Sequence, residues 1–120
     1  MTSASPFPAC SPQAVEVAWK YRWRGYDSEE AAIRALRRRC RGLAPSDAAS
    51  VLHAGLQLIE RAIRVLKPHM ESLAGIYRSR GEIAPSDIEP FAPELAQHFP
   101  DCPLDAVRSA LWSATVYHMR

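Results

Sequence analysis

A regular repeat of apolar residues in the middle of the chain constrains its fold more than any other feature. Apolar side chains recur at alternating steps of four and three, at Leu52, Leu56, Ile59, Ile63, Leu66, Met70, Leu73 and Tyr77. This spacing aligns the eight side chains on one helix face, as in a coiled-coil seam. Pro68 interrupts the repeat, because proline has no amide hydrogen and crowds the preceding turn. The sequence therefore predicts a long helical region over residues 46–80, kinked or broken at Pro68. The seam can join two copies or form the core of one, and the proline favours the core of one.

Two shorter helices are predicted before this region. The first begins near Pro12, which suits a first helical turn, and ends at Gly25. Its i, i+4, i+8 spacing indicates a core-facing stripe made of Val15, Trp19 and Trp23. The second helix is capped by Asp27 or Ser28. Its predicted core-facing residues are Ile33, Leu36, Cys40 and Leu43.

The last third of the chain is interrupted by proline. Five prolines, at positions 85, 90, 93, 100 and 103, permit only short helical pieces before a final helix that begins near Pro103. The predicted buried face of that helix is Leu104, Val107, Leu111, Ala114 and His118. The sequence APSD occurs at 44–47 and again at 84–87, and a proline followed two residues later by an acid suits a helix start.

The expected fold is all-α, a compact bundle of five or six helices. A chain of 120 residues can bury one core, and 48% apolar with 23% charged residues is typical of globular proteins. Residues 1–11 are rich in serine and proline, so we expect a flexible N-terminal arm. Residues 12–120 are then a single helical domain.

Membrane, metal and cofactor functions have no sequence signal. No apolar run approaches the roughly 20 residues of a membrane span, and the N-terminus lacks the basic start and apolar core of a secretory signal. Cys10, Cys40 and Cys102 are odd in number and widely spaced, so they form neither a disulfide framework nor a paired metal-ligand motif. We therefore expect a cytoplasmic protein with reduced thiols, no cofactor and no membrane contact.

No strong enzymatic motif is present either. The chain lacks a glycine-rich phosphate loop, a nucleophile elbow and a His-Glu-x-x-His helix. In HFPDC, His98, Asp101 and Cys102 have the chemistry of a base, an orienting acid and a nucleophile. Helix capping and a small buried thiol explain the same residues more simply, so we expect a protein that is not an enzyme.

The stretch RALRRRCR, residues 34–41, contains five arginines. At 100° per residue, four of them share a solvent-facing side of the second helix, and these are Arg34, Arg37, Arg38 and Arg41. Arg39 falls on the other flank. Such a face can bind an acidic protein surface, contact nucleic-acid phosphates, or be merely solvated. Exposed aromatics beside it could stack on bases, although the regular spacing of Trp19 and Trp23 favours the core.

Charge is distributed unevenly along the chain. Residues 20–41 carry eight basic and three acidic residues, whereas residues 82–107 carry six acidic residues and no lysine or arginine. The acidic segment would oppose nucleic-acid binding unless it faced away. We therefore expect a non-enzymatic protein–protein interaction module, an adaptor, regulator or inhibitor subunit. Its partner is an acidic protein surface, or another copy through basic 20–41 and acidic 82–105. The alternative is a small nucleic-acid-binding regulator that uses the same arginines, and the two segments can also touch inside one fold.

A second candidate surface lies on the final helix. Trp112, Val116 and Met119 fall opposite its predicted buried face. Other helices of the bundle can cover these residues. If they do not, the three residues form a partner-binding surface anchored by Trp112.

Overall fold

The chain folds into helices, with no strand among the residues that the structure describes. A computed structural model describes the backbone of residues 11–119 and the side chains of residues 11–116. The helices are α1 (Pro12–Arg22), α2 (Glu29–Arg39), α3 (Pro45–Leu66), α4 (Met70–Arg80), α5 (Pro85–Ile88), α6 (Ala92–His98) and α7 (Leu104–Met119), with 3₁₀ turns η1 (Lys67–His69) and η2 (Glu89–Phe91). The prediction of an all-α bundle is confirmed. The predicted arm over residues 1–11 lies outside the described residues, except for Ser11.

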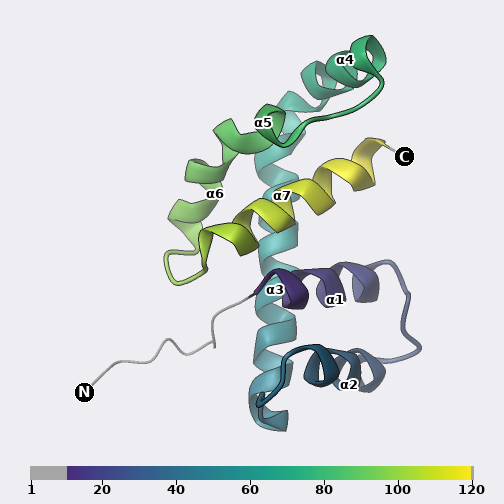
Figure 1. Ribbon diagram of the computed structural model, residues 1–120, viewed down its shortest axis with the longest axis vertical. Helices are drawn as coiled ribbons and strands as arrows, with labels where there is room; N and C mark the ends of the chain where they lie inside the picture. Colours follow the sequence, from purple (N-terminus) through teal and green to yellow (C-terminus); the bar gives the residue numbers. More distant parts are fainter. Residues whose placement is uncertain (1–10, 120) are drawn as a thin grey trace.

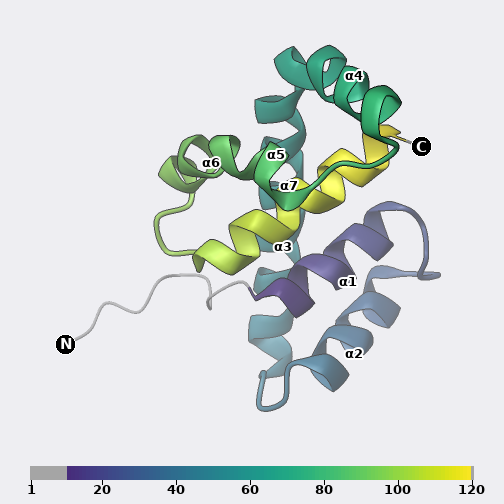
Figure 2. The same cartoon turned by 45° about the horizontal axis from the view of Figure 1, so that its top comes forward.

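The long helix α3 is the axis of the fold. Figures 1 and 2 show the same order along it, with α2 at one end, then α1, then α7, then α5, and α4 at the far end. The 3₁₀ turn η1 contains Pro68 and separates α3 from α4, so the predicted interruption is confirmed. Because proline cannot donate the helical hydrogen bond, α4 continues in a different direction.

The apolar seam lies inside one chain. Its buried members are Leu52, Ile59, Leu66 and Leu73. Leu56, Ile63 and Met70 are half-buried against the same core. Helices α1, α2 and α7 pack on α3, so the seam forms the core of one copy. The prediction that Tyr77 is buried is wrong, because this side chain is 42% exposed on α4, where it lines a cavity with Trp112 and Val116 of α7.

Small residues make up much of the contact between helices. The fully buried alanines are Ala14, Ala18, Ala32, Ala48, Ala62, Ala106, Ala110 and Ala114. A small side chain lets two helix backbones approach closely, so close packing of α1 and α7 on α3 depends on these positions. Of these alanines, only Ala114 was predicted in the core from helical spacing.

Two more residues predicted in the core are exposed. Trp23 is 50% exposed because α1 ends at Arg22 and buries a face one step away from the indole stripe. Leu104 is 47% exposed because it begins α7 at the edge of the bundle. Trp19 is half-buried. The His118 side chain lies outside the described residues.

Serine and aspartate side chains cap helix starts. Ser11 Oγ accepts from Ala14 N at 3.1 Å, and Ser28 Oγ accepts from Ala31 N at 3.2 Å. Ser28 is thus the one of the two predicted candidates that caps α2. Both APSD segments begin helices, α3 and α5. In the second, Asp87 Oδ2 accepts from Ala84 N at 2.7 Å.

We expect Asp87 to make folding stability depend on pH. The Ala84 hydrogen bond and then the Arg80 guanidinium hold the pKa of the Asp87 carboxyl below its ordinary 3.8. A lowered folded-state pKa stabilises the fold above the unfolded pKa, and this stability is lost as pH falls through the folded pKa. Asp87→Asn should therefore melt below the wild type at pH 7, and the gap should close in strong acid. Thermal melts across pH measure this gap.

Asp47→Asn is the matched control for that experiment. Asp47 holds the same position in the first APSD, and it forms no ion pair with any described side chain. Its substitution should change the melting temperature less at every pH. A gap for Asp87→Asn that did not change between neutral and acidic pH would contradict the assignment of stability to this carboxylate.

Candidate functional site

A groove lies between α1 and α2, on the side of α1 that faces away from the core. Its cavity volume is about 650 Å³. The residues that line it are Glu16, Trp19, Lys20, Trp23, Tyr26, Ala35, Arg38 and Arg39. We call it the α1–α2 groove. Three aromatic rings and three cations meet there around one carboxylate, a combination that suits an anionic ligand with apolar groups.

Helical spacing explains which residues line the α1–α2 groove. Its residues on α1 and at the α1 C-cap follow the i, i+3, i+4, i+7 pattern of one helix face, and its residues on α2 follow i, i+3, i+4. Tyr26 comes from the segment that joins the two helices. Because α1 and α2 lie side by side (Figures 1 and 2), the two faces form opposite walls.

Helix α1 ends in a tight turn that requires a left-handed backbone conformation at Arg24. Gly25 N donates to Lys20 O at 2.8 Å and Arg24 N donates to Tyr21 O at 2.9 Å, the two hydrogen bonds of a Schellman motif. Arg24 has a φ of 61°, in the left-handed region that favours glycine. A Cβ added at Gly25 would lie 2.4 Å from Lys20 Cγ. This turn positions Trp23, the cap residue, at the mouth of the α1–α2 groove.

Substitutions in this turn should change stability in opposite directions. Arg24→Gly should raise the free energy of unfolding by about 1 kcal/mol, since glycine adopts a positive φ without steric cost. Gly25→Ala should lower it by about 1 kcal/mol through the clash with Lys20. Gly75→Ala is the control, because an added Cβ meets no atom within 4 Å there. It should stabilise α4 slightly. Urea unfolding measures all three, and a stabilising Gly25→Ala would refute the close approach.

Aromatic and charged side chains contact one another around the groove. The rings of Trp19 and Trp23 meet edge to face, with centroids 5.8 Å apart and an interplanar angle of 84°. Lys20 Nζ lies 4.9 Å from the centroid of the Tyr26 ring, within cation–π distance. These contacts link Trp19 to Trp23 and Lys20 to Tyr26 within the groove.

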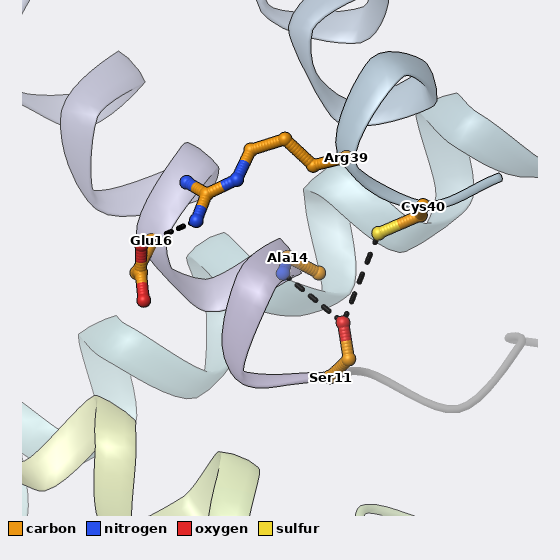
Figure 3. A network of polar contacts seen from close by, with 5 residues as sticks. All are labelled: Ser11, Ala14, Glu16, Arg39 and Cys40. Carbon is orange, nitrogen blue, oxygen red and sulfur yellow. Dashed lines mark hydrogen bonds and ion pairs between the residues drawn. The ribbon is translucent and has the colours of Figure 1, made fainter.

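Polar contacts join the two walls at the start of α1. Figure 3 shows Arg39 extending from α2 toward Glu16 on α1, with Nη2 to Oε1 at 2.7 Å. Nearby, Ser11 Oγ lies 3.8 Å from Cys40 Sγ while it also caps Ala14 (Figure 3). Arg22 pairs with Glu60 and so ties the end of α1 to α3. The sequence predicted that Arg39 lies on a different flank of the second helix from the other four arginines. In the structure Arg39 forms an ion pair with Glu16 on α1.

The four arginines predicted to share a face, Arg34, Arg37, Arg38 and Arg41, are all exposed. We call them the arginine face. Arg38 lines the α1–α2 groove, and Arg37 Nε donates to Leu43 O at 3.3 Å across the turn after α2. The helical position predicted for Arg41 is wrong, because α2 ends at Arg39 and the backbone of Cys40 is not helical, with a φ of −113° and a ψ of 83°. Arg34, Arg38 and Arg41 form no ion pair with a described side chain.

The predicted surface on α7 is partly open. Trp112 is 40% exposed and lies between two cavities of about 350 and 290 Å³. Val116 is half-buried and lines the smaller cavity beside Trp112. The Met119 side chain lies outside the described residues. Other helices therefore cover only part of this surface.

The cavities beside Trp112 carry an acidic rim, and we call these cavities with Trp112 the Trp112 surface. Its charged lining residues are Glu82, Glu89, Asp105 and Arg108. Arg108 grips Glu89 through two nitrogens, with Nη2 to Oε2 and Nε to Oε1 both at 2.9 Å. Hydrogen bonding to Glu89 raises the pKa of the Arg108 guanidinium. Three carboxylates against one guanidinium leave a balance of −2 on this surface.

The basic and acidic segments do not neutralise each other through the ion pairs of the described residues. Those pairs are Arg22–Glu60, Arg39–Glu16, His53–Glu29, Arg80–Asp87 and Arg108–Glu89. None joins residues 20–41 to residues 82–105. In both ribbon views α1 and α7 lie between α2 and α5, so these parts of the two segments face different surroundings.

Metal binding and catalysis gain no support from the described side chains. Among residues 11–116, no group of three or more His, Cys, Asp and Glu residues could hold a metal ion. His98 and Asp101, both exposed, form no hydrogen bond with each other. No helix within the described part of the chain is both long and apolar enough to cross a membrane.

Comparisons of the chain with protein-family models, curated proteins and solved structures found no match. The features of the molecule that bear on its function are the α1–α2 groove, the arginine face and the Trp112 surface. The groove was not predicted from the sequence. The signal was present in the spacing of residues 16, 19, 20 and 23, but the opposite wall depends on how α2 packs beside α1.

Proposed function

We propose that this protein is a non-enzymatic protein–protein interaction module, an adaptor, regulator or inhibitor subunit, whose α2 end binds an acidic protein surface. The observation that carries the proposal is the α1–α2 groove, where exposed Trp23 lies beside Lys20 and Arg38. Tryptophan and arginine are the side chains that most often dominate binding at protein interfaces. Solvation alone explains exposed cations, but it does not explain three aromatic rings beside them.

Exposed and unpaired arginines support an acidic partner. Arg34, Arg38 and Arg41 have no carboxylate partner among the described side chains, so an incoming acidic surface can pair with them without breaking an existing ion pair. Complementary charge raises the association rate and selects the partner. Arginine also donates in a planar fork that carboxylates accept in two places.

Charge reversal of the arginine face tests this function. Affinity capture from the native cell should enrich a protein with an acidic surface. Changing Arg34, Arg37, Arg38 and Arg41 to Glu should reduce its capture at least roughly tenfold, since an attractive contact becomes repulsive. The matched control changes the same four residues to Lys, which keeps the charge and should retain most of the capture. Equal capture by the Glu and wild-type proteins would refute a role for the arginine face.

A cytoplasmic location goes with this proposal. The odd number of cysteines in the chain does not suit a disulfide framework, and Cys40 is a free thiol in the structure. Cell fractionation with labelling of the thiols should find the protein reduced in the cytoplasmic fraction.

A nucleic-acid-binding regulator is the second candidate, and the aromatic rings of the α1–α2 groove favour it. Bases can stack on an exposed ring such as that of Trp23 while arginines contact the backbone. We expect random duplex and single-stranded oligonucleotides not to bind at micromolar concentration in low salt, as fluorescence anisotropy would show. Micromolar binding that the four Arg→Glu changes abolish, with a log K against log salt slope of about −3 to −4, would replace the protein-interaction proposal.

A further inference from the structure

Trp112 has the features of a side chain that inserts into a partner. It is 40% exposed and lines two cavities, each formed by α7 with residues of the α4–α5 region. A tryptophan in such a position costs little conformational entropy when it docks, because two χ angles define it. The residues around it in these cavities include Ile83, Ile88 and Leu111. An apolar centre with a charged rim is the usual anatomy of a protein interface.

The α1–α2 groove has the features of a socket for an indole. Its volume of about 650 Å³ exceeds the space that one tryptophan side chain fills. Trp19, Trp23 and Tyr26 offer ring faces and edges, and aromatic pairs contribute about 0.5–1.5 kcal/mol beyond the area that they bury. The groove and the inserted ring are therefore matched in chemistry as well as in size.

The charges around the two surfaces are complementary. Lys20, Arg38 and Arg39 against Glu16 give the α1–α2 groove a balance of +2. The Trp112 surface has a balance of −2, from three carboxylates and Arg108. Docking the two surfaces would bring opposite charges together at the rim while the aromatic rings meet at the centre.

Within one copy, the residues that line the α1–α2 groove come from α1, α2 and the segment between them, and none comes from α7. The groove includes α2 and the Trp112 surface includes α5, and α1 and α7 lie between these two helices in both ribbon views. A contact between unlike surfaces of identical copies is heterologous, and it repeats from copy to copy.

We infer that the acidic partner of the α1–α2 groove is a second copy of this chain, whose Trp112 inserts into the groove, so that copies associate head to tail. The inference rests on the proposed function, because it names the partner of the same site. A head-to-tail dimer still presents one free groove and one free Trp112 surface, so growth continues or closes into a ring.

Light scattering over a concentration series provides the first test. The wild-type mass should exceed the 13.4 kDa of a monomer at about 100 μM and rise further with concentration. Trp112→Ala should return the mass to that of a monomer. Leu104→Ala is the matched control, since Leu104 is exposed on the same helix and lines neither cavity beside Trp112. A wild type that stays monomeric at this concentration would overturn the inference.

Mixing two variants tests the head-to-tail geometry. The double variant Lys20→Glu/Arg38→Glu reverses two positive charges of the groove but keeps the Trp112 surface. Trp112→Ala removes the inserted ring but keeps the groove. Each should be a monomer alone, and an equimolar mixture should form a heterodimer that grows no further. Arg64→Glu, a charge reversal of an exposed arginine on α3 outside both surfaces, should associate like the wild type. A mixture that stayed monomeric while the wild type associates would overturn the head-to-tail contact, because a contact between two like surfaces gives no complementation.

The outcome also separates this inference from the proposed function. Circular dichroism first shows that each variant is folded. If the wild type is monomeric but the arginine face still determines capture of an acidic protein, the proposed function stands and the self-association falls. If the wild type associates through Trp112 and the groove while no other protein depends on the arginine face, the module acts on its own copies.

Discussion

Replacing Ile59 with alanine should lower the free energy of unfolding by about 2–5 kcal/mol. Ile59 is fully buried on α3, where the packed helices leave no room to refill the cavity that alanine would create. Ile63, one turn further along the same seam, is only half-buried. Ile63→Ala should therefore cost less than Ile59→Ala, although the two residues are chemically identical and both belong to the predicted seam.

Urea unfolding followed by circular dichroism measures both variants. The midpoint should fall further for Ile59→Ala, with little change in the slope of free energy against urea. Equal losses for the two variants would mean that the seam is buried evenly, as in a symmetric contact between two copies. That result would contradict the intramolecular core described here.

Replacing Ala110 with leucine should lower the free energy of unfolding by about 3 kcal/mol. Ala110 has no exposed surface on α7, and α7 packs against both α3 and α1. Three added carbon atoms would force the helices apart or drive side chains from their preferred rotamers. Ala31→Leu is the matched control, because Ala31 is only half-buried at the start of α2. It should change stability by less than about 1 kcal/mol in urea unfolding. A tolerated leucine at position 110 would show that close helix contact at α7 is not required.

Periodicity predicted the helices well because it depends on local geometry. The interruption at Pro68, the capping of α2 by Ser28 and the helix starts at both APSD segments follow from the chemistry of single residues and their near neighbours. These features needed no knowledge of which helices meet. The same is true of the exposure of the arginine face, since charged side chains on a helix face water unless a partner covers them.

The core-facing predictions failed where a helix ended or ran out of neighbours. Trp23, Tyr77 and Leu104 each continue an apolar stripe, yet each is exposed. Trp23 and Leu104 lie at the ends of helices, and Tyr77 lies at a cavity between α4 and α7. An apolar stripe predicts the direction in which a side chain leaves its own helix. It does not predict whether another helix packs against that side chain. The prediction for Arg41 failed for a related reason. The spacing of 100° per residue assumed that the helix continues through Arg41, but α2 ends two residues earlier.

The candidate site divides in the same way. Sequence alone identified the arginine face and Trp112, because unusual residues stand out in a printed chain. It did not identify the α1–α2 groove, whose two walls are separated in sequence and meet only when α2 turns back beside α1. The cavities beside Trp112 likewise combine α7 with residues from the α4–α5 region.

The sequence by itself determined the helical class, the interruption of the long helix, the helix caps and the uneven charge. These depend on spacing, proline geometry and residue type within one or two helical turns. Only the tertiary structure decided which apolar residues are core, where the buried alanines let helices approach, and which aromatic rings remain exposed beside cations. Those properties depend on contacts between residues far apart in the chain, and each such contact is set by how whole helices pack.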